Sequence, residues 1–261
     1  MIISQVVDIR MFKYNQFPYL EVRRPFILGT QQGQWKPTIS HIFSKVAEER
    51  GLLQRIYDQN IDGLHIAAGL DFPKLVHVHG TLSKVNCEFC KATMPFADFC
   101  TEVQTKIKNI YDLTDATAPA ESSNIICESC GRAGMKPSTV LYGTDLPRDA
   151  LVAMSRDFPA DVDLLVIAGT SLTVYPAAGL VSRIRPGVPR ILINLELVGE
   201  DVMRFDDAEC DDVFVQGSCD EGFLVLADKL GWLPDLCRHQ ALLCEASSAM
   251  LNRLILSKES V

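Results

Sequence analysis

The sequence predicts an α/β fold with a doubly wound parallel sheet and a small inserted zinc-binding domain, and three observations support this prediction. Short, β-branched apolar runs recur along the chain between helical or turn-rich segments, which is the alternation that builds parallel sheets. Residues 81–147 interrupt that alternation with scattered polar and small residues. Two Cys-x-x-Cys pairs, which together supply four thiolates, lie inside the interruption.

The overall composition excludes several classes of protein. The 261 residues are 48% hydrophobic, enough for a complete core, and the formal net charge is −8. Such an acidic chain has no general attraction for phosphate backbones or anionic lipids, so we expect no direct nucleic-acid binding and no membrane binding. Asp8 and Arg10 lie where a signal peptide would be apolar, and the cysteine pairs favour a reducing compartment. We therefore expect an intracellular protein, cytoplasmic or nuclear.

The first clear element is an amphipathic helix that begins near Thr38 and ends at Gly51. Its apolar residues recur at helical spacing, and glycine is a frequent helix terminator. A short strand over residues 52–57 should follow, and buried strands are expected at residues 164–168 (LLVIA), 191–193 (ILI) and 213–215 (VFV). The tail over residues 234–261 has a helical pattern and should pack on the core or on a partner.

Polar or glycine-containing turns follow the predicted strands. In open α/β sheets, ligands bind beyond the carboxyl ends of the strands, so several such turns favour one shared nucleotide-sized site. Any one of them alone would be an ordinary strand-to-helix turn. The turns are Gln59-Asn60-Ile61-Asp62, Gly169-Thr170-Ser171, Asn194-Leu195-Glu196 and Gly217-Ser218-Cys219.

The two cysteine pairs have the local spacing of a structural zinc site. Cys87 with Cys90, and Cys127 with Cys130, would form a closed tetrahedral set with no open position for a substrate. We expect one Zn²⁺ per chain, whose role is to fold the small domain. Residues 91–126 between the pairs should loop out or form a helix of their own.

In several segments the sequence resembles the sirtuin deacetylases. The resemblance implies a Rossmann-like NAD-binding domain over residues 1–80 and 148–233 and a small zinc-binding domain with a substrate-binding segment over residues 81–147. The helical pattern alone marks residues 234–261 as a separate C-terminal tail. The matching segments are YDQNIDGLHIAAGL (57–70), LVHVHGTL (75–82), the cysteine pairs, KPSTVLYGTDLP (136–147), DLLVIAGTSLTVYPAAGL (163–180), ILINLE (191–196) and VQGSCDEGFLVLADKLGW (215–232).

The resemblance also implies roles for individual residues. It makes His79 the general base, which suits an imidazole because this group exchanges protons near neutral pH. The implied NAD⁺ contacts are Gln59, Asn60 and Asp62 at the nicotinamide and its ribose, Gly169, Thr170 and Ser171 at the ribose and phosphates, Asn194 and Glu196 at the adenosine ribose, and Cys219 near the adenine.

One further segment is implied to bind the substrate. Residues 140–143 should pair with the substrate peptide as an added strand and line the acyl-lysine tunnel. The expected partners are acylated-lysine proteins, with histones or other basic peptides among the candidates. Tyr142-Gly143-Thr144 stands where the family usually has Phe-Gly-Glu, which leaves the peptide preference open. The segment comprises Val140, Leu141, Tyr142 and Gly143.

The resemblance fails at the front of the chain. The family opens with a strand, a glycine-rich turn of the GAGIS type and a loop containing Asp-Phe-Arg, and this chain has no GAG sequence ahead of Lys13. Asp8-Ile9-Arg10 is best taken as a chance match to the loop. We expect the amides that cradle the pyrophosphate to be absent or replaced. Three explanations account for the missing segment: a truncated form of an active enzyme, a pseudoenzyme, or a chain completed by a partner. The intact downstream residues favour the first explanation.

The predicted function is an NAD-dependent protein-lysine deacetylase or deacylase that transfers the acyl group to ADP-ribose and releases nicotinamide. Two alternatives stay open: a mono-ADP-ribosyltransferase on the same scaffold, and a catalytically impaired sirtuin that acts as an acyl-peptide binding module. A zinc-ribbon nucleic-acid adapter would need a basic face, which the sequence lacks. Turnover that disappears in a His79→Ala variant would identify the deacylase.

Overall fold

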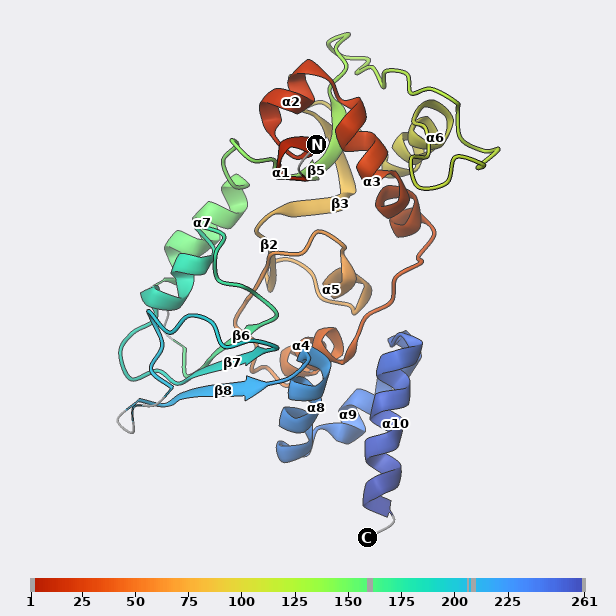
Figure 1. Cartoon of the computed structure of the whole chain (residues 1–261). Coiled ribbons are helices and arrows are strands. Elements are labelled where there is room, and N and C mark those ends of the chain that lie inside the picture. Colours follow the sequence, from red (N-terminus) through yellow and green to blue (C-terminus); the bar gives the residue numbers. More distant parts are fainter. Residues whose placement is uncertain (1–2, 159–161, 206, 208–209, 260–261) are drawn as a thin grey trace. The chain divides into compact units, whose positions relative to one another are not determined.

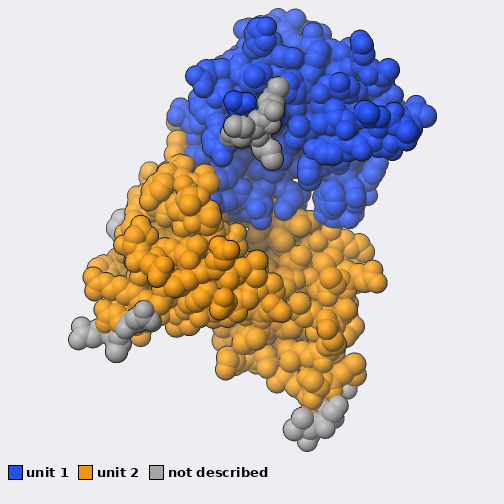
Figure 2. Space-filling model, in the orientation of Figure 1, with its two compact units in different colours: residues 1–35, 58–63, 77–147 blue, residues 36–57, 64–76, 148–261 orange. Residues whose placement is uncertain are grey.

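The computed structural model describes residues 3–158, 162–205, 207 and 210–259, and contacts within the chain divide it into two compact units (Figures 1 and 2). Unit 1 comprises residues 1–35, 58–63 and 77–147, and unit 2 comprises residues 36–57, 64–76 and 148–261. The strands β1 (Ile56–Asp58) and β2 (Leu75–His77) pair with each other at the points where the chain passes from one unit to the other. The division into a cofactor domain, a zinc domain and a tail stays a prediction.

Unit 2 contains a parallel sheet of three strands in the order β6-β7-β8. Val166 lies opposite Ile191, which lies opposite Val213, so all the strands run in the same direction. The predicted α/β class with a parallel sheet is therefore confirmed, and the strands coincide with the apolar runs. Unit 2 contains α4 (Ile39–Glu49), α5 (Leu64–Ala67), α7 (Arg148–Asp157), β6 (Leu165–Ala168), the 3-10 helix η1 (Ala178–Arg183), β7 (Arg190–Asn194), β8 (Asp212–Gln216), α8 (Cys219–Lys229), α9 (Leu233–Arg238), the 3-10 helix η2 (Gln240–Leu242) and α10 (Glu245–Glu259).

Helix α4 begins and ends where its sequence pattern predicts. Thr38 is the residue before its first turn, and Gly51 follows its last turn with a positive φ of 71°. The strand predicted at residues 52–57 is wrong in its boundaries, because β1 begins only at Ile56. The Leu52 and Leu53 amides instead donate to the Ala47 carbonyl and close the end of α4.

The core of unit 2 packs the C-terminal helices against α4 and α8. The Phe43 ring lies 4.9 Å from that of Phe223 and 5.1 Å from that of Trp232. Leu236 and Leu251, from α9 and α10, are fully buried in the same cluster. The helical tail therefore packs on the core of its own unit. This is one of the two arrangements that we expected, the other being packing on a partner.

Unit 1 is built on an antiparallel sheet in the order β4-β3-β5, covered by α3 and α6. Thr81 of β3 lies opposite Ser138 of β5, and Cys87 lies opposite Met135. The segment between the cysteine pairs forms a helix, α6, as one of the expected outcomes. Unit 1 contains α1 (Ile3–Val6), α2 (Ile9–Tyr14), α3 (Phe17–Gln31), β3 (Gly80–Cys87), β4 (Thr93–Met94), α6 (Phe96–Lys106) and β5 (Met135–Thr139).

The described part of the chain contains no helix with the length and apolar character that a bilayer crossing requires.

Candidate functional site

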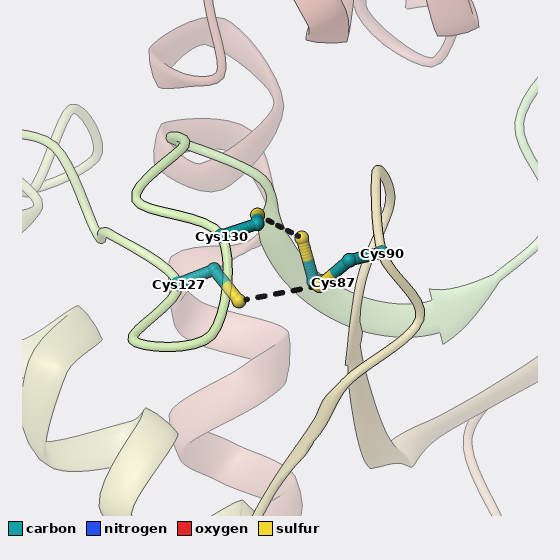
Figure 3. Close-up of side chains that lie close together, drawn as sticks. All are labelled: Cys87, Cys90, Cys127 and Cys130. Carbon is teal, nitrogen blue, oxygen red and sulfur yellow. Dashed lines mark hydrogen bonds between the residues drawn. The ribbon is translucent and has the colours of Figure 1, made fainter.

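The four predicted zinc ligands come together in unit 1. All the cysteine sulfurs lie within 4.8 Å of one another, and Figure 3 shows the side chains converging from two loops. The Sγ atoms of Cys87 and Cys130 are 3.7 Å apart, and those of Cys90 and Cys127 are 3.6 Å apart. Tetrahedral thiolates at a Zn–S distance of about 2.3 Å lie about 3.8 Å apart, whereas disulfide sulfurs are separated by about 2 Å. The spacing fits a structural zinc ion.

The backbone repeats the same turn around each cysteine pair. The Lys91 amide donates to the Cys87 carbonyl at 3.0 Å, and the Gly131 amide donates to the Cys127 carbonyl at 2.8 Å. The residue after the second cysteine has a positive φ in both turns, 64° at Lys91 and 68° at Gly131. Each Cys-x-x-Cys segment is therefore shaped to point both sulfurs inward, which agrees with a closed structural site.

The predicted base, His79, is oriented by a backbone carbonyl. Its Nδ1 lies 2.9 Å from the carbonyl oxygen of Gln59. Because a carbonyl can only accept a hydrogen bond, Nδ1 must carry the proton, and Nε2 of the neutral ring then has a free lone pair. His79 is partly exposed. The turn after β1 thus selects the tautomer in which Nε2 is the basic atom.

Gly80 beside His79 is required by the sheet. Its φ is 77°, and a Cβ atom there would lie 1.8 Å from the Ser138 carbonyl oxygen of β5. Only glycine lets the two backbones approach so closely. The pairing of β3 with β5 therefore demands a residue without a side chain directly after the candidate base.

Asp58 is a buried carboxyl beside the predicted site residues that the sequence did not single out. Its Oδ1 accepts the Asn60 amide at 2.9 Å, and its carbonyl accepts the Val78 amide at 2.8 Å. Oδ2 is buried without a hydrogen-bond partner among the described residues. Burial, opposed by the Asn60 amide and reinforced by repulsion from Asp62, raises the pKa of Asp58 to about 7. The available signal was an acidic residue directly before the Gln59 turn, at the end of an otherwise apolar strand.

The predicted residues of unit 2 converge at the carboxyl edge of the parallel sheet. The Gly169 amide donates to the Ile193 carbonyl at 3.1 Å, and the Gly217 amide donates to the Asn194 carbonyl at 3.0 Å. Asn194 Nδ2 donates to the Thr170 carbonyl at 3.3 Å. The turns after β6, β7 and β8 are thus tied to one another by hydrogen bonds.

At the same edge, the Gly169 backbone packs closely against the first residue of α8. Gly169 has a φ of 60°, and a Cβ atom there would lie 2.9 Å from the Cys219 sulfur. Asn194 Nδ2 also donates to the Glu196 carbonyl at 2.9 Å, while the Glu196 side chain is exposed. Gly217 and Ser218 precede the first turn of α8, where Ser218 forms a capping box with Glu221. The contacts of these turns with the ribose and adenine of NAD⁺ stay predictions.

Residues 140–143 follow β5 in unit 1 and enter a turn, in which Gly143 has a positive φ of 85° and the Leu141 carbonyl accepts the Thr144 amide at 3.1 Å. The Val140 amide donates to the His79 carbonyl at 2.9 Å, which continues the β3 pairing. Leu141 is fully buried in the core, whereas Tyr142 and Gly143 are exposed. Their roles in binding a substrate stay predictions, as do those of the other predicted site residues.

The sequence matches the Sir2 family model over residues 3–176. NAD-dependent protein deacetylase sirtuin-2 of Danio rerio is 35% identical over 244 residues, which cover 88% of this chain and 59% of that protein. NAD-dependent protein deacetylase sirtuin-3 of Mus musculus is 33% identical over 231 residues, with 88% of this chain and 61% of that protein covered. NAD-dependent protein deacetylase hst2-1 of Emericella nidulans is 34% identical over 233 residues, which cover 89% of this chain and 57% of that protein. The chain thus spans less than two thirds of the length of these relatives.

Proposed function

Because the chain belongs to the Sir2 family, we propose that it is an NAD-dependent protein-lysine deacetylase or deacylase. In this reaction the acyl group leaves the lysine nitrogen for ADP-ribose, nicotinamide is released and one water is consumed. The observation that carries the proposal is the orientation of His79, whose Nδ1 is bonded to the Gln59 carbonyl. A base held in this way presents one defined nitrogen to its reaction partner.

His79 is proposed to move a proton at Nε2. Uptake of a proton there leaves the Nδ1 hydrogen bond to Gln59 in place, so the ring does not need to turn during the reaction. The Asp58 side chain accepts a hydrogen bond from the Asn60 amide and so fixes the backbone of the turn that carries Asn60. Asn60 and Asp62 would then orient the leaving group, since a fixed geometry lowers the entropic part of the barrier.

The cofactor contacts of unit 2 are proposed at the carboxyl edge of its sheet. Bound NAD⁺ would supply an electrophilic ribose carbon from which nicotinamide departs. Gly169, Thr170 and Ser171 would approach its ribose and phosphates, Asn194 and Glu196 its adenosine ribose, and Cys219 its adenine. The hydrogen bonds that join the three turns support this assignment, because they hold the turns in one arrangement before a ligand arrives.

We also propose a class of substrate and a cellular compartment for the protein. The substrates are acylated-lysine proteins, with histones or other basic peptides among the candidates. They would contact residues 140–143 outside the Tyr142 backbone groups, which pair with Val7 and Ile9. We place the protein in the cytoplasm or the nucleus. None of the nine cysteines forms a disulfide, which suits a reducing compartment.

The proposal is tested by nicotinamide release from NAD⁺ in the presence of an acetyl-lysine peptide. The chain and its His79→Ala variant are compared, with zinc content and thermal unfolding measured on both proteins. We expect turnover that requires the peptide and falls by at least about a hundredfold in the variant. A folded, zinc-loaded protein that binds the peptide without any turnover would overturn the deacylase proposal.

A further inference from the structure

The N-terminal segment of unit 1 is paired with the proposed substrate strand. The Tyr142 amide donates to the Val7 carbonyl at 2.8 Å, and the Tyr142 carbonyl accepts the Ile9 amide at 3.0 Å. Asp8 and Tyr142 therefore form a parallel β-bridge. A residue held at both of its backbone groups has a fixed position, so helices α1 and α2 form a wall beside residues 140–143.

This wall borders a pocket that is open to solvent. The cavity has a volume of about 630 Å³ and is lined by Gln5, Asp8, Arg10, Met11, Tyr14 and Tyr142. Its volume lies within the range of pockets that bind small molecules or single large side chains. All of its lining residues belong to unit 1, and Tyr142 connects the pocket directly to the proposed substrate strand.

The charged residues of the pocket neutralise each other. Arg10 Nε donates to Asp8 Oδ1 at 3.2 Å, and Nη2 donates to Oδ2 at 3.1 Å, which is a two-pronged ion pair. The Asp8 Oδ1 atom also accepts the Arg10 and Met11 amides. Hydrogen bonds from the Arg10 side chain and backbone lower the pKa of Asp8, so the carboxylate stays ionised and paired. The pocket has no net charge to offer to a charged ligand.

The remaining groups favour a flat, uncharged ligand. Tyr14 is 90% exposed and Tyr142 is 55% exposed. Among the described residues, neither phenol hydroxyl makes a hydrogen bond and neither ring stacks on another aromatic ring. Tyrosine, methionine and arginine are also the residue types enriched in binding surfaces, and guanidinium and phenol planes both stack on aromatic rings. An aromatic side chain could contact Met11, Tyr14 and Tyr142 without breaking the Asp8–Arg10 pair.

We propose that this pocket binds an aromatic side chain of the substrate polypeptide next to the acyl-lysine, with Tyr14 and Met11 as specificity-determining residues. The inference rests on the proposed function, because it takes residues 140–143 as a segment that contacts the substrate. It adds a preference for the sequence around the modified lysine. The N-terminal helices, rather than the zinc site, set this preference.

The test compares acetyl-lysine peptides that differ at one flanking position. Each position on either side of the lysine carries Phe, Ala, Glu or Lys in turn, and both kcat/KM and peptide affinity by fluorescence anisotropy are measured. At one position, Phe should improve both quantities by roughly five- to tenfold over Ala. Glu and Lys should show no such gain.

The variants connect that preference to the pocket. Tyr14→Ala and Met11→Ala should each bring the Phe-to-Ala ratio towards one, and Tyr14→Phe should keep it. The matched control is Leu113→Ala, which removes an 87% exposed apolar side chain elsewhere in unit 1 and should leave both the ratio and the basal turnover unchanged. Since Tyr14 is exposed, its truncation should also leave the melting temperature unchanged.

The inference would be overturned if the wild-type protein showed no Phe preference at any position. It would also be overturned if the Phe-to-Ala ratio of kcat/KM were unchanged in Tyr14→Ala, or if that variant changed the KM for NAD⁺ and left this ratio unchanged. The anisotropy measurement separates this inference from the deacylase proposal. A Phe preference in binding that depends on Tyr14, without turnover, would support the pocket and reject the enzymatic function.

Discussion

The four-cysteine site of unit 1 and the strand-end cluster of unit 2 are assembled in different ways. Each half of the cysteine site is local, since the Lys91 and Gly131 amides bond to the cysteine carbonyls of their own turns. The strand-end cluster depends on sheet register, because Asn194 reaches the carbonyl of Thr170, 24 positions away. A local turn can form wherever its few residues are present, whereas a register-dependent cluster exists only when the sheet is paired correctly.

The difference predicts unequal tolerance to mutation. Loss of one zinc ligand removes a metal that joins two segments of the core, and such losses are among the most destabilising changes known. A side chain at the edge of a sheet whose strands are already paired can be removed with little loss of folding stability. The four changes below, taken from the largest expected effect to the smallest, test this contrast.

The largest effect is expected for Cys127→Ala. Cys127 is buried in the core of unit 1, and its loss leaves three thiolates and an incomplete zinc site. We expect loss of bound zinc and a decrease in the free energy of unfolding of at least about 5 kcal/mol. Elemental analysis and chemical denaturation measure the two quantities. Cys210→Ala, outside the cluster, is the control, and a Cys127→Ala protein that kept its zinc and its stability would contradict the structural role.

The next effect is expected for Gly80→Ala, which tests how far unit 1 depends on β3–β5 pairing. The new Cβ atom would clash with the Ser138 carbonyl oxygen, so we expect a loss of more than about 4 kcal/mol in unfolding free energy. Gly33→Ala is a matched control, because Gly33 has a similar φ of 63° but no atom within 4 Å of its Cβ position. That variant should lose only about 1–2 kcal/mol from backbone strain. Equal losses in the two variants would rule out the close approach as the cause.

Asp58→Asn should have a smaller effect that depends on pH. Burial raises the pKa of this carboxyl to about 7 in the folded chain, so wild-type stability falls as the pH rises from about 4 through 7. The variant keeps an oxygen for the Asn60 amide and has no charge to bury. It should gain relative stability with rising pH, by no more than about 4 kcal/mol above pH 7. Denaturant melts at pH 5 and pH 8 measure the gain, and a difference independent of pH would exclude a buried charge.

The smallest effect on stability is expected for Asn194→Ala. The variant loses two side-chain hydrogen bonds, to the Thr170 and Glu196 carbonyls, at the rim of the sheet. We expect a cost of about 1 kcal/mol in unfolding free energy, with NAD⁺ affinity reduced roughly tenfold. Calorimetric titration measures the affinity. Asn252→Ala on α10 is the control, and unchanged NAD⁺ binding by Asn194→Ala would remove this cluster from the proposed cofactor site.

Local patterns were sufficient for a large part of the fold. The helical spacing from Ile39 to Val46 placed α4 within two residues of its ends, and three short apolar runs located β6, β7 and β8. The cysteine spacing singled out the four cysteines whose sulfurs come together. The strand over residues 52–57 was misplaced, because the amides of Leu52 and Leu53 had a competing acceptor at the end of α4.

The sequence by itself determined α4, the strands of the parallel sheet, the four cysteines that cluster and the family, since periodicity and motif spacing act within a few residues of chain. Only the tertiary structure revealed the buried Asp58 carboxyl beside the Gln59 turn, the crowding at Gly80 and the pocket that the N-terminal helices form with Tyr142. Each of these depends on which distant segments lie against a residue. Burial and backbone approach are properties of packed neighbours, and no pattern within one segment of chain encodes them.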